Sequence, residues 1–393
     1  MPFNIALDLL IVFHKIQTMV HKSAKHSSFY LVAAFLFLSF LICCQSDKVE
    51  NLGIFGVSRQ QSILGQDGCT PIPLDKIMMW TFGDTILGTW KGELSVDTTF
   101  EESAVMNNMI SNSLAFTEIP DDMSFKNLNF EFYKQNGKVA PFIKNYPGED
   151  TREWRFWPVD GIQIDSTVYV YYYIIFVERN VNGKNKNLFP FKVKGTGIAE
   201  WVKPDSWKVG DPVFFKRSPK IFSENEPVFG DSIERQGEFL YVIGHGRPVN
   251  NMVPVYIARV KASEIKNRLA YNFLDEQNRW SPDIKYARAL FYDAMGELSF
   301  TYNDYLKKFI IIYCSMDGKI KYVDFKDFTF LPNKKAKVIY VLPLLPKIES
   351  RPHLYYYSGK EIFHTRKGIY AIYINPAIYQ PILIRIPYSA VPD

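Results

Sequence analysis

One pattern recurs along most of this chain and limits the folds open to it: a strand, a tight polar turn and a second, aromatic-rich strand. Beyond residue 52, helical periodicity is almost absent, while aromatic and β-branched runs alternate with Gly, Asn and Asp turns. The pattern is clear in four segments: WPVDGIQIDSTVYVYYY from Trp157, GDSIERQGEFLYVIGH from Gly230, LSFTYNDYLKKFIIIYC from Leu298 and HLYYYSGKEIFHTRKGIYAIYI from His353. An earlier copy around FGDTILGTW, residues 82–90, makes five, at spacings of very roughly 55 to 75 residues.

This spacing suits the four-stranded blades of a β-propeller, so we predict an all-β fold, a five-bladed β-propeller. The copies share a pattern rather than residue identity, and a pair of β-sandwiches is therefore the competing architecture. No Pro- or Ser-rich linker interrupts residues 52–393, which predicts one domain across that range. Only residues 262–270 read as a short helix.

The first 44 residues have the order of an export signal. The uncharged segment FYLVAAFLFLSFLI, residues 29–42, follows Lys22 and Lys25 and precedes two cysteines. A spanning helix needs roughly 20 apolar residues, so a permanent transmembrane anchor is the weaker interpretation. Residues 1–18 are not needed for a signal, and Met19 could be the true start.

The end of this segment, Leu41-Ile42-Cys43-Cys44, has the order of a bacterial lipobox. We predict that Cys44 carries the lipid and that residues 45–51 form a polar tether, although Cys43 is unusual at its position. The protein is then exported and membrane-anchored in the bacterial cell envelope, periplasmic or surface-exposed.

Charge, cysteines and motifs exclude several function classes. Removing residues 1–43 discards three lysines and one aspartate, so the formal charge of +5 becomes +3, and nucleic acid is not an implied partner. The remaining cysteines, Cys69 and Cys314, are too few for a disulfide framework, though a single bridge is possible. Zinc-hydrolase histidine spacing, a GxSxG elbow, a P-loop and a diagnostic calcium loop are all missing from the sequence. We therefore expect no metal and no cofactor.

Two carboxylates bracket the first expected hairpin. Asp67 lies in GQDG, residues 65–68, and Asp84 ends a strand in which Trp80, Phe82 and Asp84 alternate onto one face. A carboxylate beside these rings would be partly desolvated, which raises its pKa toward that of a general acid. The alternative is that Asp67 belongs to a turn and that Asp84 caps one.

Several other residues are candidate substrate ligands. Trp157 and Asp160 place a ring beside a carboxylate, a combination that suits sugar faces and hydroxyls, although Asp160-Gly161 is also a turn signal. Asn112 lies between two serines in an apolar strand and could face substrate or clasp neighbouring blades. Arg247 and Glu297 are further channel candidates, each with a structural alternative.

Taken together, these motifs resemble the family called domain of unknown function 4185. Its pattern couples GQDG, a strand ending in FGDT, an SNS strand and a W-P-x-D-G turn, and this chain has all four in order over about residues 52–390. The resemblance implies a five-bladed propeller related to glycoside hydrolases, some of them endo-D-arabinanases. It implies that Asp67 and Asp84 are the catalytic pair, and that Asn112, Asp160 and Arg247 line the channel or position substrate.

Two functions remain open from the sequence. In the first, the protein is a glycoside hydrolase in which one of Asp67 and Asp84 protonates the leaving oxygen while the other attacks the anomeric carbon or activates water. In the second, it is a non-catalytic surface lipoprotein that binds glycan or docks a partner protein. In both, the expected partners are a polysaccharide or glycan and the membrane that holds the lipid, and the protein is expected to be a monomer.

Overall fold

The fold is given by a computed structural model of the chain. It describes residues 48–56, 62–92, 99–121, 125, 128–178, 191–249, 252–327, 335–347 and 354–392. The predicted signal segment and Cys44 lie outside these residues. Residues Val49–Asp393 form one compact unit.

Within the described residues the chain forms five antiparallel sheets of four or five strands. The first sheet has the order β2-β3-β5-β6, with β4 also paired to β3: β2 Ile63–Leu74, β3 Ile77–Trp90, β4 Ala104–Ile110, β5 Ser113–Glu118 and β6 Glu131–Phe132. The second has the order β9-β10-β11-β12, with β13 also paired to β11: β9 Trp154–Ile164, β10 Thr167–Val177, β11 Phe191–Val202, β12 Lys216–Arg217 and β13 Phe222–Ser223. The third runs β14-β15-β16-β17-β18: β14 Val228–Gln236, β15 Phe239–His245, β16 Val255–Lys261, β17 Asn272–Leu274 and β18 Trp280–Ser281.

The last two sheets complete the set. The fourth runs β19-β20-β21-β22: β19 Ser299–Asn303, β20 Lys308–Ser315, β21 Lys319–Phe325 and β22 Lys337–Val341. The fifth runs β23-β24-β25-β1: β23 Tyr357–Thr365, β24 Gly368–Asn375, β25 Gln380–Ile386 and β1 Glu50–Ile54. Short segments lie outside the sheets: α3 Phe100–Ser103, the hairpin β7 Lys134–Gln135 and β8 Lys138–Val139, and the 3-10 turns η4 Ala262–Glu264, η5 Arg268–Ala270, η6 Ile284–Tyr286 and η7 Tyr388–Ala390.

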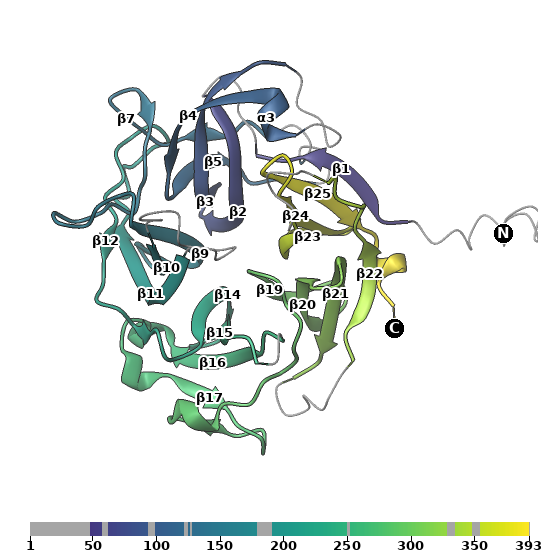
Figure 1. Ribbon diagram of the computed structural model, residues 1–393. Helices are drawn as coiled ribbons and strands as arrows, with labels where there is room; N and C mark the ends of the chain where they lie inside the picture. The colour runs from purple at the N-terminus through teal and green to yellow at the C-terminus, as the bar shows by residue number, and fades with distance from the viewer. Residues whose placement is uncertain are drawn as a thin grey trace, which may run out of the picture. The chain divides into compact units, whose positions relative to one another are not determined.

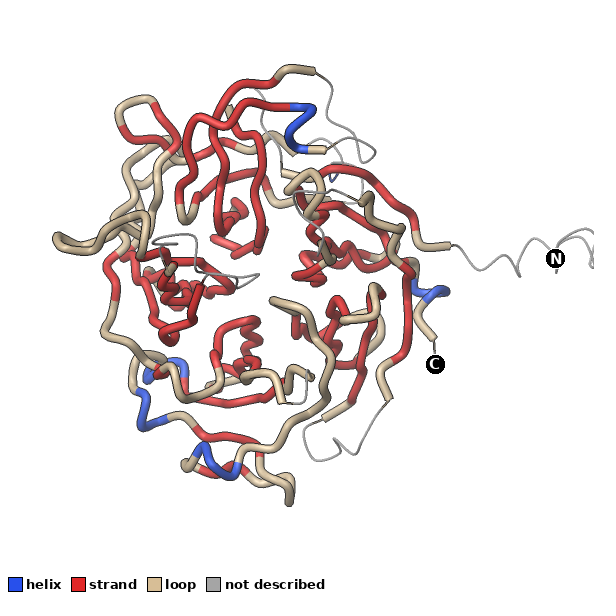
Figure 2. Tube along the Cα trace, in the orientation of Figure 1, coloured by secondary structure: helices blue, strands red, loops and turns tan. Residues whose placement is uncertain are grey.

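The five sheets are the blades of a propeller. The first strand of each sheet (β2, β9, β14, β19 and β23) is its innermost strand, and each inner strand contacts the inner strands of the two neighbouring blades, which closes the ring (Figure 1). Strands make up most of the described chain, and the few helical segments lie outside the inner strands (Figure 2). The predicted five-bladed β-propeller is confirmed.

Apolar cores lie between the blades, and strand alternation explains them. Along β10, Val170 and Tyr172 pack in a cluster shared with blade one, whereas Tyr171 and Tyr173 pack in a cluster shared with blade three. Because successive side chains of a strand point to opposite faces, each blade contributes to two such cores. Further cores of the same kind join blades three and four, four and five, and five and one. The ring is therefore held by burial between every pair of neighbours.

The N-terminal strand closes this ring. Strand β1 pairs with β25, with Glu50 opposite Arg385 and Ile54 opposite Ile382, so it is the outermost strand of the last blade. A propeller blade completed from the other end of the chain ties the first and last blades together. The expected tether, residues 45–51, therefore ends earlier than predicted, because Glu50 and Asn51 belong to β1.

Three local expectations need correction. Residues 262–270 form the separate 3-10 turns η4 and η5, not one helix. Cys69 and Cys314 are both buried free thiols, in the blade five–one core and the blade four–five core respectively, so they form no bridge. His353, the expected start of the last unit, lies outside the described residues, and the inner strand of that blade starts at Tyr357. In the part of the chain that is described, no helix is long and apolar enough to cross a membrane.

Candidate active site

An irregularity in the pairing of β2 with β3 sets the direction of the Asp67 side chain. The register of β2 with β3 shifts between Gln66 and Gly68 and again between Gly68 and Thr70. Both residues after Asp67 have left-handed backbone, with φ of 76° at Gly68 and 69° at Cys69. Glycine adopts this region without steric cost and cysteine does so rarely, so the segment is a strained bulge. Bulges re-aim side chains, and this one accounts for the glycine that follows Asp67 in GQDG.

The opposite strand leaves room for the Asp67 carboxylate. A Cβ atom placed on Gly83 of β3 would lie 2.3 Å from Oδ1 of Asp67. Any larger residue would therefore displace this carboxylate. The glycine that precedes Asp84 in FGDT thus provides the space for Asp67, and the two motifs form one structural unit.

The hydrogen-bond partners of the Asp67 carboxyl group are the neutral hydroxyls of two tyrosines. The hydroxyl of Tyr379 donates to Oδ2 of Asp67 at 2.9 Å, and that of Tyr357 lies 3.3 Å from the same oxygen. Burial, reinforced by the negative charges of Asp84 and Glu297, raises the pKa of Asp67 to about 8. Asp67 therefore carries its proton at neutral pH.

Asp84 lies in a different environment although it belongs to the same hairpin. Its Oδ1 accepts from Nη1 of Arg155 at 2.7 Å and from the indole Nε1 of Trp157 at 2.9 Å. Burial raises the pKa of Asp84, while the Arg155 guanidinium opposes that rise and favours the ionised form. The two carboxylates therefore have different partners: tyrosine hydroxyls hold Asp67, whereas a guanidinium and an indole hold Asp84.

Glu297 lies near this pair and connects it to a buried lysine. The carboxylate of Glu297 accepts from Nζ of Lys360, and the same Nζ donates to Oγ1 of Thr70 at 2.7 Å. Lys360 is only 2% exposed. A buried ammonium requires such partners because its desolvation is costly. Lys360 and Glu297 thus form an internal ion pair on the ring axis.

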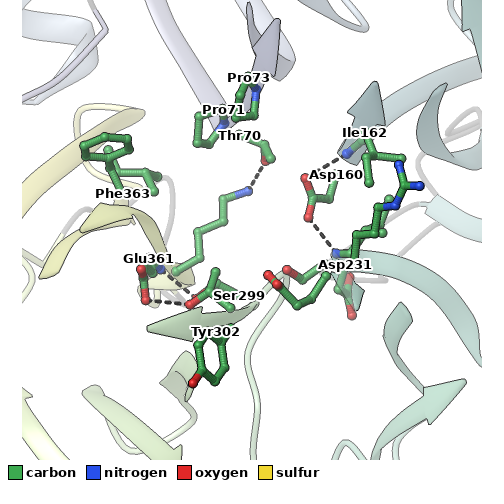
Figure 3. A pocket seen from close by; sticks show the side chains of 18 of the residues that line it. Thr70, Pro71, Pro73, Asp160, Ile162, Asp231, Ser299, Tyr302, Glu361 and Phe363 are labelled. Carbon is green, nitrogen blue, oxygen red and sulfur yellow. Dashed lines mark hydrogen bonds between the residues drawn. The ribbon is translucent and has the colours of Figure 1, made fainter. Parts of the chain in front are cut away.

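A cavity of about 450 Å³ lies beyond this ion pair, lined from all five blades (Figure 3). The carboxylate centre consists of Asp67, Asp84 and the side chains that bond them. On three inner strands, a residue that lines the cavity comes three positions after a residue of this centre. These pairs are Asp67 and Thr70, Trp157 and Asp160, and Tyr357 and Lys360. Neither Asp67 nor Asp84 is among the residues that line the cavity, so the cavity and the carboxylate centre are displaced from each other along the strands. Asp160 therefore lies with the cavity and not with Asp67 and Asp84.

Asp160 is held mainly by backbone. Its Oδ1 accepts from the N–H of Gly161 and its Oδ2 from the N–H of Ile233 in the next blade, each at 2.7 Å. Burial raises the pKa of Asp160 to about 6 despite these bonds. These contacts join blades two and three.

Asn112 is fully buried and is held entirely by protein groups. Its Oδ1 accepts from the N–H groups of Phe142 and Ile143, at 2.9 and 3.0 Å. Its Nδ2 donates to the carbonyls of Ile143 and Phe156, at 3.1 and 3.0 Å. The amide has no group left for a substrate, so its geometry is that of the inter-blade clasp considered above and not that of the predicted substrate ligand.

The last predicted substrate ligand, Arg247, is exposed beyond the end of β15. It donates to the backbone carbonyl of Glu224 and is not among the residues that line the cavity. No contact of the described residues joins it to Asp67 or Asp84. Of the predicted ligands, the structure therefore brings together Trp157 and Glu297 with the carboxylate pair, and it separates Asn112, Asp160 and Arg247 from it.

Sequence reasoning missed several neighbours of the pair. Arg155, Tyr357 and Tyr379 bond the two carboxylates directly, and Lys360 bonds Glu297. Their only sequence signal was position, because Arg155 lies two residues before Trp157, and Tyr357 and Lys360 lie within the last repeat unit, which starts at His353. A further group is His245, whose Nδ1 lies 2.7 Å from Oδ2 of the buried Asp231.

Among the described residues, no group of three or more His, Cys, Asp or Glu side chains is placed to hold a metal ion.

Fold and site together define a five-bladed propeller with a buried, asymmetric carboxylate pair near the start of its inner strands. The chain belongs to the family described as Domain of unknown function (DUF4185), whose model matches residues 57–384. Among curated proteins, none matches the chain in sequence.

Solved structures share the fold at low identity. One is a protein from Bacteroides ovatus ATCC 8483 described as a candidate hydrolase, 15% identical, with a TM-score of 0.57 over 86% of each chain. A second is the GH43_1 enzyme from Xanthomonas citri, 10% identical, with a TM-score of 0.44 over 86% of this chain and 90% of that one. A third is the alpha-L-arabinofuranosidase PaAbf62A from Podospora anserina, 10% identical, with a TM-score of 0.43 over 86% of this chain and 96% of that one. At these identities the likeness concerns the fold alone.

Proposed function

We propose that this protein is a glycoside hydrolase that cleaves an extracellular polysaccharide, with arabinan as the first substrate to test. The observation that carries the proposal is the difference between Asp67 and Asp84. Asp67 is buried against tyrosine hydroxyls with its pKa raised to about 8, whereas an arginine and an indole donate to Asp84 and oppose the rise that burial causes in its pKa. Glycoside hydrolysis requires such a pair, one carboxylic acid and one carboxylate.

In the proposed reaction Asp67 protonates the glycosidic oxygen as the bond from that oxygen to the anomeric carbon breaks. Asp84 stabilises the positive charge that develops on the sugar ring, and it either attacks the anomeric carbon or removes a proton from the attacking water. The water supplies the hydroxyl of the new reducing end, and its remaining proton restores the acid. Arg155 and Trp157 hold Asp84 in place through this cycle, since both donate to its Oδ1.

The test is release of reducing ends from arabinans and from a broad glycan panel by the purified protein. Asp67→Asn and Asp84→Asn should each remove most of the activity that wild type shows. Asp165→Asn is the matched control, because Asp165 lies in the exposed turn between β9 and β10. Two results together would contradict hydrolysis and favour a binding protein. The wild type would release no sugar from any glycan of the panel, and both variants would bind one of these glycans as tightly as the wild type does.

We also propose that the protein is exported and lipidated at Cys44, which would hold the propeller at a membrane of the cell envelope. Support comes from the apolar segment at residues 29–42 and from the position of Cys44 directly after it. Only residues 45–49 separate Cys44 from β1. Mass spectrometry of the mature N-terminus tests this proposal. A mature chain that begins elsewhere, or that lacks a lipid on Cys44, would contradict it.

A further inference from the structure

The third blade carries a histidine at the end of the ring where the carboxylate pair lies. His245 is the last residue of β15, and it pairs with Val228, the first residue of the inner strand β14. Asp67 likewise lies near the start of its inner strand, β2. The inner strands of a propeller run in one direction along its axis, so His245 and Asp67 lie at the same end of the ring.

One nitrogen of the His245 ring is held by the protein. Its Nδ1 lies 2.7 Å from Oδ2 of Asp231, whose side chain is fully buried, and Oδ1 of the same carboxylate accepts from the hydroxyl of Tyr173. The other nitrogen, Nε2, has no hydrogen-bond partner among the described residues, and 20% of the side chain is exposed. The protein therefore orients this ring and leaves Nε2 for a ligand.

The charges around this ring favour its protonated form. Burial lowers the pKa of His245, but the charge and the hydrogen bond of Asp231, with the charge of Glu297, outweigh that effect and raise the pKa. Both nitrogens of an imidazolium carry protons, so Nε2 is then a donor. The charge of Glu297 also raises the pKa of Asp67, and Glu297 is therefore a neighbour of both His245 and Asp67.

We propose that His245 is the sugar-binding residue of the third blade and that its Nε2 donates to a hydroxyl oxygen of the sugar at Asp67 and Asp84. The inference rests on the proposed hydrolase function. The other four blades each supply side chains to this end of the ring: Asp67 and Asp84, Arg155 and Trp157, Glu297 just before β19, and Tyr357 and Tyr379. A sugar hydroxyl accepts such a bond, and His245 gives the third blade a contact with the same ligand.

The cavity at the other end of the ring contains a histidine with the same local contacts, which provides a matched control. Nδ1 of His364 lies 2.6 Å from Oε1 of the buried Glu361, and its side chain is also 20% exposed. His364 lies near the end of β23 and lines the cavity, which Asp67 and Asp84 do not line. The two histidines differ in the end of the ring that they occupy, so only His245 should affect glycan binding.

The experiment measures binding of arabino-, xylo- and cello-oligosaccharides by calorimetry on the full chain, with Asp84→Asn as the parent so that the ligand is not consumed. His245→Asn keeps a donor near the position of Nδ1 for Asp231 but has none at the position of Nε2, so it should lower the affinity about 10- to 100-fold. His245→Gln carries its amide nitrogen near the position of Nε2 and should recover part of this loss. His364→Asn should leave the affinity unchanged.

Three outcomes would overturn the proposal: equal losses of affinity in the two Asn variants, an unchanged affinity in His245→Asn, and a parent that binds none of these oligosaccharides. Should thermal unfolding show that His245→Asn does not fold, His245→Gln is compared with His364→Gln, and equal affinities of these two would also overturn it. A wild type that cleaves no glycan, while His245→Asn still loses affinity, would count against hydrolysis and not against the sugar contact. Cleavage by the wild type with equal affinities of the Asn variants would count against the sugar contact alone.

Discussion

The same five inner strands carry two unlike polar regions, and their comparison shows what makes a buried carboxylate chemically useful. Near the start of these strands, Asp67 and Asp84 are held by side chains: two tyrosines, one arginine and one tryptophan. Toward the end, in the cavity, Asp160 is held by backbone N–H groups. Burial raises the pKa of carboxyl groups in both regions, to about 8 for Asp67 and about 6 for Asp160.

What differs is the arrangement of partners. In the first region the two neighbouring carboxylates have partners of opposite kind, neutral hydroxyls for Asp67 and a cation for Asp84, and such a difference moves two pKa values apart, as acid and base catalysis needs. In the cavity, Asp160 joins two blades, and Glu361 lies 2.6 Å from Nδ1 of His364 and accepts from the hydroxyl of Thr301. These contacts mainly stabilise the ring. Burial alone therefore does not identify the active end.

The largest expected effect separates the two regions by activity. Asp67→Asn and Asp84→Asn should each lower kcat/KM by about 10²–10⁴-fold, the usual contribution of a general acid or base. Glu234→Gln should leave kcat/KM within about twofold, although Glu234 is a cavity residue whose pKa burial raises to about 7. The measurement is the initial rate on whichever glycan wild type cleaves. A larger loss in Glu234→Gln than in the two aspartate variants would reverse the assignment of the ends.

The second prediction concerns the ion pair between the two regions. Lys360→Met leaves the carboxylate of Glu297 without its buried partner, and breaking a buried pair in this way should lower the free energy of unfolding by about 3–5 kcal/mol. Urea denaturation measures this loss. Lys285→Met is the control, since Lys285 is exposed and pairs with Asp283 at the surface, where solvent screens such pairs and they contribute little to stability. Equal stability of the two variants would show that Lys360 is not essential to the ring.

The third prediction sharpens the contrast between Asp67 and Asp84. Arg155 lowers the pKa of Asp84, so Arg155→Gln should raise it and move the acidic limb of the pH–rate profile upward by about 1–3 units. The basic limb, which reflects loss of the proton from Asp67, should move less, because Arg155 donates to Asp84 whereas the hydrogen bonds to Asp67 come from Tyr357 and Tyr379. A profile in which only the basic limb moves would exchange the roles of the two aspartates.

The smallest expected effect is on stability. The pKa of Asp67 in the folded state, about 8, lies above its ordinary value of 3.8, so the folded state binds a proton more tightly than the unfolded state. The contribution of Asp67 to stability is then fully present below about pH 4 and is lost as the pH rises through about 8. Asp67→Asn removes this loss, so its Tm should exceed that of wild type near pH 8 and approach it near pH 4. Parallel Tm curves across this range would mean that Asp67 is not the group that holds the proton.

Much of the fold was predictable because it depends on local pattern. The repeat units expected to start at Trp157, Gly230 and Leu298 do so within three residues of the first residues of the inner strands β9, β14 and β19. The strands of each unit carry apolar residues on both faces, so both faces of the resulting sheet must be buried. Stacking the sheets as blades around a ring buries them. The bulge after Asp67 was not predictable, because the left-handed backbone at Cys69 is disfavoured locally and exists only within the surrounding sheet.

The candidate site was predictable in part. Asp67 and Asp84 belong to one hairpin, so their proximity follows from short-range pairing of β2 with β3. Asn112 could be recognised as a buried amide, yet whether it faced a substrate or a neighbouring blade depended on the segment at Phe142 and Ile143. Arg247 seemed equally placed for the channel, but β15 ends before it and leaves it exposed.

The sequence by itself determined the class of fold and the pair of carboxylates, because strand alternation, turn residues and the two glycine-flanked aspartates act over short distances along the chain. Only the tertiary structure decided which partners each aspartate has. That choice depends on Arg155, Tyr357 and Tyr379, which approach from other blades, the last of them 312 residues from Asp67. The physical reason is that the pKa of a buried group reflects the charges and donors around it in space, and ring closure brings them there from distant parts of the chain.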